Sequence, residues 1–256
     1  MTEVDFDAIT AYQRYKLMAS LIVPRPIALV TTLGANGVAN AAPFSMFNML
    51  GEDPPILMLS INRLTDGRLK DTAANILASR EFVVHLTDEP MAEQMHRCGE
   101  ALPLDVSELT HVGLTPVASH TVKPPRIAQA PVAFECVLHE TLETASRYVF
   151  IGRVQWLAAR DGLIDTQAWR VNLRDYRPIA RFGASFYTRT NVATMDQQLQ
   201  DVCNTARQRS VVVYTIAFSA PTNGQTQSRN CATTVSRYYS ATATTTGNNK
   251  KINVGY

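Results

Sequence analysis

Residues 22–32 read Ile22-Val23-Pro24-Arg25-Pro26-Ile27-Ala28-Leu29-Val30-Thr31-Thr32, and this stretch decides the fold class of the 256-residue chain. Two prolines fix the backbone in front of an apolar run, which predicts a buried strand over 26–32. The sequence Gly34-Ala35-Asn36-Gly37 follows, and Asn-Gly is the strongest short signal for a hairpin turn. The stretch therefore predicts a strand whose successor returns antiparallel to it.

Further apolar runs of strand length extend this pattern along the chain. Many strands with few helices, and no regular β-α-β alternation, predict a mainly β protein built as a barrel or a sandwich. Neither GxGxxG nor GxxxxGK[ST] occurs, so the sequence lacks these nucleotide-binding fingerprints. The predicted strands cover 55–61, 82–86, 132–138 and 148–158, and the predicted helices cover 8–21, 70–79 and 90–102.

Composition limits the class of function. Hydrophobic residues make up 46% and charged residues 18%, which is typical of a globular protein, and a net charge of +2 argues against nucleic-acid binding through bulk basic charge. No CxxC, HxxxH or HExxH occurs, so we expect no metal site. The N-terminus lacks a basic region followed by an apolar region, and no apolar run approaches ~20 residues. We therefore expect a cytoplasmic protein without a membrane partner.

The charge pattern changes near Thr190. Residues 1–190 carry a net charge of −2, whereas residues 191–256 carry +4 and have no acid after Asp201. The second part is rich in Thr, Ser, Asn and Gln and ends in the polar run 241–249. We expect a first domain over 1–190 and an appendage of uncertain fold over 191–256, whose last ~15 residues are mobile.

Arg25 is the first candidate binding residue. Pro24 and Pro26 flank it at the start of the predicted strand, and we expect them to aim its side chain outward. The alternative is a stiff start to a strand with a solvated arginine.

The segment around Ser45, Phe47 and Asn48 is the second candidate. On a strand, Ser45 and Phe47 would share one face and Asn48 would point the other way. Small residues, a hydroxyl and an amide suit the polar edge of a flat heterocycle. The alternative is an ordinary strand with a polar outer face.

The third candidate joins Arg63 to Lys70-Asp71-Thr72 at the start of a predicted helix. A helix N-terminus offers unpaired N–H groups and partial positive charge, and two bases beside it would favour a phosphate. Asp71 or Thr72 is the expected N-cap. Plain helix capping with solvated bases is the alternative. No pattern indicates a catalytic acid, base or nucleophile, so we assign no catalytic residue.

Taken in order, these segments resemble the flavin reductase-like family, which folds as an FMN-binding split barrel. The resemblance covers roughly residues 8–190. Its motifs are Tyr15-Lys16-Leu17, residues 22–32, Gly37, Asn40, residues 42–48, Asp53-Pro54-Pro55, Ser60-Ile61, Lys70-Asp71-Thr72, Asn75-Ile76, residues 81–84, residues 176–183 and Ser185-Phe186-Tyr187.

The resemblance implies a six-stranded antiparallel split barrel and a homodimer that binds FMN noncovalently near the subunit interface, with FAD as an alternative. It implies that NADH or NADPH gives hydride to the flavin, or that FMN passes electrons to a downstream acceptor. His85 departs from the family, which often has Asn there. By position, Ser45, Phe47 and Asn48 would line the isoalloxazine, Ser60, Arg63, Lys70, Asp71 and Thr72 would hold the ribityl chain and phosphate, and Arg25 would assist.

The tail resembles the C-terminal end of the von Willebrand A-type domain of tight-adherence pilus assembly proteins. The DxSxS metal motif of such domains is absent. Cys203 and Cys231 could pair in an oxidising compartment, but in a cytoplasmic chain we expect free thiols. A genuine fusion and a joined reading frame are both open as origins of the tail. The resemblance rests on Met195-Asp196, Leu199, Cys203, Ala206-Arg207, residues 213–218, Cys231-Ala232 and Tyr238-Tyr239.

The leading hypothesis is an FMN-dependent oxidoreductase that transfers hydride from NAD(P)H to bound flavin. One alternative is a non-enzymatic FMN-binding electron carrier with the same site. Another is a scaffold or adhesion-related protein in which residues 191–256 mediate the interaction.

Overall fold

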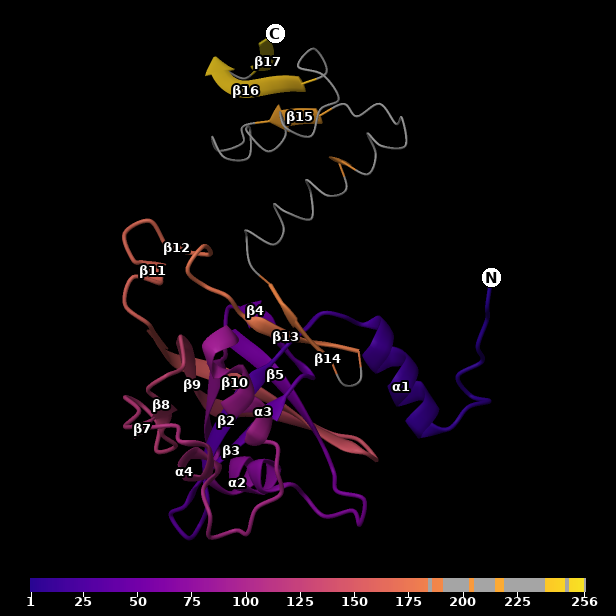
Figure 1. Ribbon diagram of the computed structural model, residues 1–256, viewed down its shortest axis with the longest axis vertical. Coiled ribbons are helices and arrows are strands. Elements are labelled where there is room, and N and C mark those ends of the chain that lie inside the picture. The colour runs from indigo at the N-terminus through magenta and orange to yellow at the C-terminus, as the bar shows by residue number, and fades with distance from the viewer. Residues whose placement is uncertain (184–185, 191–202, 205–214, 219–237, 247–248, 256) are drawn as a thin grey trace. The chain divides into compact units, whose positions relative to one another are not determined.

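The computed structural model describes residues 1–183, 186–190, 203–204, 215–218, 238–246 and 249–255. The chain divides into two units, Met1–Thr190 and Asn191–Tyr256, and each is described by itself (Figure 1). Among the described residues, no helix combines the length and the apolar character that a membrane crossing requires.

The first unit is built on a seven-stranded antiparallel sheet of order β3-β2-β6-β9-β10-β5-β4 (Figure 1). Its two end strands, β3 and β4, are consecutive in the chain and are separated by Ser45 and Met46 alone. The strands span Ala28–Leu33 (β2), Ala39–Phe44 (β3), Phe47–Glu52 (β4), Pro55–Asn62 (β5), Glu81–Leu86 (β6), Val132–Glu143 (β9) and Arg147–Ala159 (β10).

This connection closes the sheet into a barrel. The Ser60 N–H donates to the Met46 carbonyl over 2.8 Å, so the ladder with β5 continues into the junction. Counting β3 and β4 as one bent strand gives the six strands that the family resemblance implies. We call Ser45 and Met46 the seam.

The predicted strands are confirmed as β2, β5, β6, β9 and β10. The predicted hairpin turn is confirmed as well, because β2 and β3 pair antiparallel across it. Gly37 closes the turn with φ +78°, a conformation that favours glycine. Its N–H donates to the Gly34 carbonyl over 2.9 Å.

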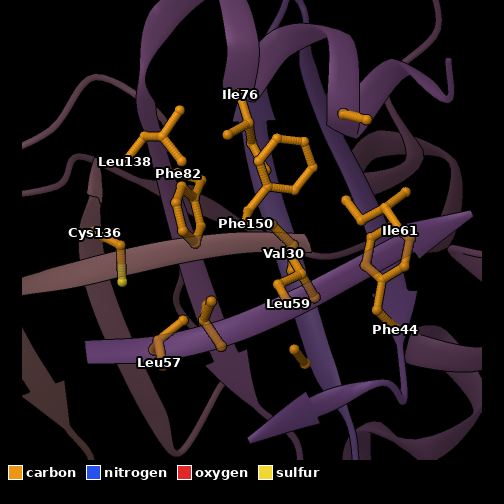
Figure 2. Close-up of a cluster of buried hydrophobic side chains, with 13 residues drawn as sticks. Val30, Phe44, Leu57, Leu59, Ile61, Ile76, Phe82, Cys136, Leu138 and Phe150 are labelled. Carbon is orange, nitrogen blue, oxygen red and sulfur yellow. The ribbon is translucent and has the colours of Figure 1, made fainter. Parts of the chain in front are cut away.

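The barrel interior is filled by alternate residues of the strands (Figure 2). Phe82 and Phe150 are fully buried near its centre. A Cβ at Gly152 would lie 2.4 Å from Phe82 Cζ, so glycine is required there. The interior also contains Ala28, Val30, Phe44, Leu57, Leu59, Ile61, Ala73, Ile76, Val84, Cys136 and Leu138.

Helices cover parts of the barrel. The helix α2 (Asp71–Ser79) buries Thr72, Ala73 and Ile76, whereas α1 (Ala11–Leu21) buries only Ala19. A short 3-10 helix (Glu89–Met91), α3 (Ala92–Arg97) and α4 (Glu108–Val112) supply Met91, Met95, Leu109 and Val112 to a second apolar cluster with Leu29 and Ile127. The helix predicted over 90–102 therefore ends earlier, at Arg97, and Cys98 and Gly99 turn the chain.

Three small sheets complete the first unit. The strand β1 (Arg25–Pro26) pairs antiparallel with β13 (Ile179–Phe182), and β13 pairs with β14 (Phe186–Arg189). This pairing joins the beginning and the end of the unit. The other two sheets pair β7 (Pro116–Val117) with β8 (Arg126–Ile127) and β11 (Ile164–Asp165) with β12 (Arg170–Val171).

The second unit contains β15 (Thr215–Phe218), β16 (Tyr238–Thr246) and β17 (Asn249–Gly255). The strand β16 pairs parallel with β15 and antiparallel with β17. Most residues that carry the von Willebrand A-type resemblance, Cys231 included, lie outside the described residues, and the mobility expected at the tail's end stays a prediction. Cys203 is disulfide-bonded, so the expectation of a free thiol is wrong there.

Candidate functional site

A cavity of about 360 Å³ opens beside the seam, and we call it the basic cavity. Segments far apart in the chain build its wall: α1, the loop before α2, α3, and strands from both the barrel and the β1-β13-β14 sheet. It is lined by Tyr15, Arg25, Ile27, Pro43, Phe44, Ser45, Met46, Ser60, Asn62, Lys70, Met95, His96, Gly99, Arg147, Arg181 and Tyr187.

The charge of this lining has one sign. Four basic side chains, Arg25, Lys70, Arg147 and Arg181, contribute to it, and no carboxylate does among the described residues. Positive charge gathered in a concave site favours an anionic ligand.

Arg25 is buried, with 6% of its surface exposed. Its Nη1 donates to the carbonyls of Ala19 and Ile22, and its Nη2 donates to the carbonyl of Gly183 over 3.2 Å. The expectation of an outward side chain is therefore wrong, because the guanidinium turns in to bind the unpaired carbonyls at the end of α1. Among the described residues, its buried Nε finds no hydrogen-bond partner. Burial lowers the pKa of Arg25, and the nearby Arg181 charge lowers it further against the opposing effect of Tyr15.

Lys70 is the N-cap of α2, with an extended backbone and no capping bond from its side chain. The expectation that Asp71 or Thr72 would cap the helix is wrong, since both already lie within it. The Lys70 ammonium lies 5.9 Å from the centre of the Phe44 ring. Burial lowers the pKa of Lys70, and the Arg147 charge lowers it further.

Ser45 lies at the seam and lines the cavity. The chain leaves the β2 ladder after Phe44 and joins the β5 ladder at Phe47, so strand alternation does not hold across the seam. The expectation that Ser45 and Phe47 share a face is therefore wrong: Phe47 packs against the barrel core. Asn48 is exposed and its Oδ1 accepts from the Met49 N–H over 2.9 Å.

Of two further predicted residues, Ser60 and Arg63, only the first lines the cavity. Ser60 lies on β5, is 8% exposed and lines the cavity. Arg63 lies outside the lining: its Nη2 forms an ion pair with Glu143, and its Cζ is 4.8 Å from the centre of the Tyr148 ring.

Thr72 and Asp71 also lie outside the lining. Thr72 is buried, and its Oγ1 accepts from Asn40 Nδ2 over 2.9 Å. Asp71 is exposed and borders a separate pocket with Glu108. The structure thus brings together Arg25, Ser45, Ser60 and Lys70, and the binding role of every predicted residue stays a prediction.

Sequence reasoning missed six polar side chains of the wall: Tyr15, Asn62, His96, Arg147, Arg181 and Tyr187. His96 Nδ1 and Tyr187 Oη are 2.9 Å apart, and Arg181 Cζ lies 4.8 Å from the centre of the Tyr187 ring. Arg181 and Tyr187 belong to motifs that carry the family resemblance, which was a usable signal. No sequence signal indicated Arg147 or His96, because folding alone brings them to the cavity wall. Arg147, for example, starts β10 opposite Asn62 on β5.

Titratable groups are also buried outside the cavity, His85 and Glu135 among them. His85, which departs from the family pattern, is fully buried on β6, and its Nδ1 is 2.9 Å from the Leu29 carbonyl. Its Nε2 accepts from the Ile127 N–H over 3.0 Å. Burial lowers the pKa of His85 to about 4.

The second group is Glu135, which is also fully buried. Its carboxylate accepts from the N–H groups of His120 and Thr121 and from the Thr121 hydroxyl, over 2.6 to 2.9 Å. Arg126 Nε lies 3.4 Å away. Burial alone would raise the pKa of Glu135, but these hydrogen bonds outweigh it and lower the pKa.

Residues 18–178 match the family described as "Flavin reductase like domain". The chain belongs to this family. An uncharacterized protein of Aquifex aeolicus is 41% identical over 175 residues, which cover 68% of this chain and 89% of the relative. The uncharacterized protein YwrF of Bacillus subtilis is 39% identical over 189 residues, which cover 72% of this chain and 92% of YwrF.

Solved structures are similar to this flavin reductase-like chain. The 2-nitrobenzoate 2-nitroreductase NbaA of Pseudomonas fluorescens is 37% identical with a TM-score of 0.68, covering 74% of this chain and 92% of NbaA. Nitrilotriacetate monooxygenase component B of Bacillus cereus is 31% identical with a TM-score of 0.71, covering 75% and 96%. A split barrel domain of Shewanella frigidimarina, 22% identical with a TM-score of 0.62, covers 72% and 91%. The predicted mainly β split barrel is confirmed.

The residues that match the family do not include every residue that lines the basic cavity. Tyr15, Arg181 and Tyr187 line the cavity but lie outside the matched residues 18–178. One part of the wall of this flavin reductase-like domain is therefore supplied by flanking segments.

Proposed function

We propose that this chain is an FMN-dependent oxidoreductase of the flavin reductase type, which transfers hydride from NAD(P)H to bound flavin. The observation that carries the proposal is the basic cavity: four cations and no carboxylate line it among the described residues, in a member of the flavin reductase-like family. The phosphate of FMN carries about two negative charges at neutral pH and would match such a lining.

The residues present fit FMN. Lys70 and Arg147 offer two cations to a phosphate, and Ser60 offers a hydroxyl on the same wall. The orphaned Nε of Arg25 is a buried donor that an anionic or carbonyl group of the ligand would satisfy. Ser45, with the neighbouring Phe44, would contact the isoalloxazine.

When bound, FMN supplies the acceptor for the hydride of NAD(P)H. The chain's own contribution would be binding, orientation and electrostatics. Apolar side chains such as Phe44 and Met95 would exclude water from one side of the ring, and the basic residues would stabilise the added negative charge. Such a role needs no catalytic acid or base from the protein, which agrees with the absence of a predicted constellation.

We also propose a homodimer in which a second copy covers α1. Only Ala19 of this helix is buried, although its sequence is rich in large apolar side chains. Exposed apolar groups gathered on one helix are typical of an interaction surface. The exposed residues are Tyr12, Tyr15, Leu17, Met18 and Leu21. Light scattering on the purified full chain would give twice the mass of 28.3 kDa if the proposal holds.

The test is a visible absorption spectrum of the purified protein after addition of FMN and gel filtration, followed by anaerobic NADPH and, separately, NADH. Retained flavin that bleaches supports the proposal and shows which dinucleotide donates. Retained flavin that neither dinucleotide bleaches would favour the electron carrier. Absence of retained flavin would overturn the assignment of the basic cavity.

A further inference from the structure

The buried side chain of Arg25 joins three segments of the first unit. Its Nη1 donates to the Ala19 carbonyl and, over 2.9 Å, to the carbonyl of Ile22, the C-cap of α1. Its Nη2 donates over 3.2 Å to the carbonyl of Gly183, which directly follows β13. The guanidinium therefore fastens the ends of α1 and β13 to β1, on which Arg25 itself lies. We call these three hydrogen bonds the Arg25 clamp.

The end of α1 depends on this clamp. The last carbonyls of a helix have no partner within it, and the partial negative charge at a helix C-terminus favours a cation. Arg25 supplies both the donors and the charge. Ala19, whose carbonyl the clamp binds, is also the one buried residue of α1, so little of this helix is packed against the rest of the unit.

The two fastened segments carry part of the wall of the basic cavity. The helix α1 supplies Tyr15, and β14, which pairs with β13, supplies Tyr187. Both tyrosines lie outside residues 18–178, which match the family. The position of this part of the wall therefore depends on how firmly Arg25 is held.

One donor of the Arg25 guanidinium is left over by the clamp. Arg25 is 6% exposed and lines the cavity, and its buried Nε has no hydrogen-bond partner among the described residues. A buried N–H without an acceptor is unfavourable, so a ligand atom that accepts from it lowers the free energy. Because Nε, Nη1 and Nη2 belong to one rigid plane, an acceptor at Nε also fixes the directions of the Nη hydrogen bonds.

We propose that Arg25 is a positioning residue that couples occupancy of the basic cavity to the order of α1 and of the paired strands β13 and β14. A ligand oxygen accepts from Nε, and the clamp then holds both segments more firmly. By thermodynamic linkage, a firmly held wall binds the ligand more tightly in return. The inference rests on the proposed function for the identity of the ligand, FMN, whose phosphate, ribityl chain and ring all offer oxygen acceptors.

The test is amide hydrogen exchange on the full chain with and without FMN. In the unsubstituted chain, FMN is expected to slow exchange at least about tenfold at Ala11–Leu21 and Ile179–Phe182. In Arg25→Lys the charge stays, but one ammonium lacks the planar fork that reaches three carbonyls and a ligand atom together. Slowing at these two segments is therefore expected to stay within about twofold. Slowing at Asp71–Ser79 is expected in both proteins, because Lys70 lines the cavity in front of this helix.

Arg153→Lys is the matched control, since it makes the same substitution at an exposed position of β10 outside the lining. It is expected to behave as the unsubstituted chain does. The NMR signal of the Arg25 Nε–H, identified by its loss in Arg25→Lys, is expected to shift and to exchange more slowly when FMN is added. A purely structural arginine would speed up exchange when replaced but would leave the slowing by FMN unchanged.

Riboflavin and inorganic phosphate, each tested alone, identify the accepting oxygen. Slowing at Ala11–Leu21 by riboflavin and not by phosphate assigns it to the ring or the ribityl chain, and the reverse pattern assigns it to the phosphate of FMN. Either result supports the coupling. Slowing by FMN at Asp71–Ser79 but not at Ala11–Leu21 would overturn it, and this comparison needs no variant and so holds even if Arg25→Lys does not fold. Equal slowing in Arg25→Lys would overturn it as well.

The flavin-free proteins keep the two proposals distinguishable. Without a ligand, Arg25→Lys is expected to exchange at least about tenfold faster than the unsubstituted chain at Ala11–Leu21, because the carbonyls at the end of the helix lose their donors. If FMN does not bind, but inorganic phosphate slows exchange in the unsubstituted chain and not in Arg25→Lys, the coupling stands and the proposed function fails. If FMN binds and the flavin-free proteins exchange alike at Ala11–Leu21, the proposed function stands and the coupling fails.

Discussion

The buried carboxylate of Glu135 and the basic side chains of the cavity belong to the same unit, but the charges and hydrogen-bond partners around them differ. Glu135 is surrounded by donors from His120 and Thr121 and lies near Arg126. In the cavity, Lys70 has Arg147 as its charged neighbour, and no described residue is a hydrogen-bond partner of the buried Nε of Arg25.

This difference is the one expected between a buried charge that stabilises the fold and charges that are arranged to bind a ligand. A buried charge with its full set of donors contributes to folding, because removing it leaves those donors unpaired. Like charges held close together oppose folding and are relieved when an anion arrives. The cavity therefore stores electrostatic free energy that a ligand can recover.

The largest expected effect comes from replacing the buried carboxylate of Glu135. Glu135→Gln keeps the shape but turns an amide group toward N–H donors, so we expect the free energy of unfolding to fall by about 3 kcal/mol. Urea denaturation measures this. A loss below about 1 kcal/mol, the range of a surface ion pair, would contradict the structural role.

The pH dependence of stability gives the next largest effect. The pKa of His85 falls from 6.5 to about 4 on folding, so the unfolded chain takes up this proton first as pH falls. Stability from this group is complete above pH 6.5 and is lost as pH falls toward 4, by about 2 kcal/mol between pH 7 and pH 5. Denaturation at both pH values measures it. His85→Gln is the control, and an equal pH dependence in that variant would contradict the assignment.

The next prediction neutralises one cation of the basic cavity. Lys70→Met is expected to weaken FMN binding at least about tenfold, since it removes a charge-assisted bond, while flavin-free stability stays equal or rises. Fluorescence titration and denaturation measure the two quantities. Arg63→Met is the matched control, with an expected change in FMN affinity within about twofold. An equal loss in both variants would restore Arg63 to the phosphate site.

Deleting residues 191–256 is expected to have the smallest effect. Every described residue that lines the basic cavity lies between Tyr15 and Tyr187, so we expect FMN affinity to change by less than about twofold. The same fluorescence titration on the truncated chain measures it. Loss of flavin binding or of the dimer on truncation would instead favour the scaffold hypothesis, in which the tail mediates the interaction.

The sequence predicted the barrel well because its signals are local. Apolar runs and the Asn36-Gly37 turn reveal strands and a hairpin without knowledge of distant partners. The helix predicted over 8–21 begins at Ala11, and the one predicted over 90–102 ends at Arg97, because helix boundaries depend on local caps and turns that apolar spacing does not reveal.

The site was predicted less completely because it depends on pairings between distant segments. Arg25 was expected outward because the carbonyls that bind it, those of Ala19, Ile22 and Gly183, become its neighbours only after folding. Arg147 and His96 reach the same wall through separate elements, which spacing along the chain cannot reveal. Lys70 was found because it precedes a helix, and this is a local signal.

The seam has a consequence for the order of folding. Residues 28–62 form a meander in which each strand pairs with one close in sequence, because β3 and β4 make one strand between β2 and β5. The hairpin of β9 and β10 is equally local. The pairings of β2 with β6, of β6 with β9 and of β5 with β10 join these pieces over longer stretches of chain. Since distant contacts require slow loop closure, we expect two preformed pieces to meet in the rate-limiting step, with the seam already bent.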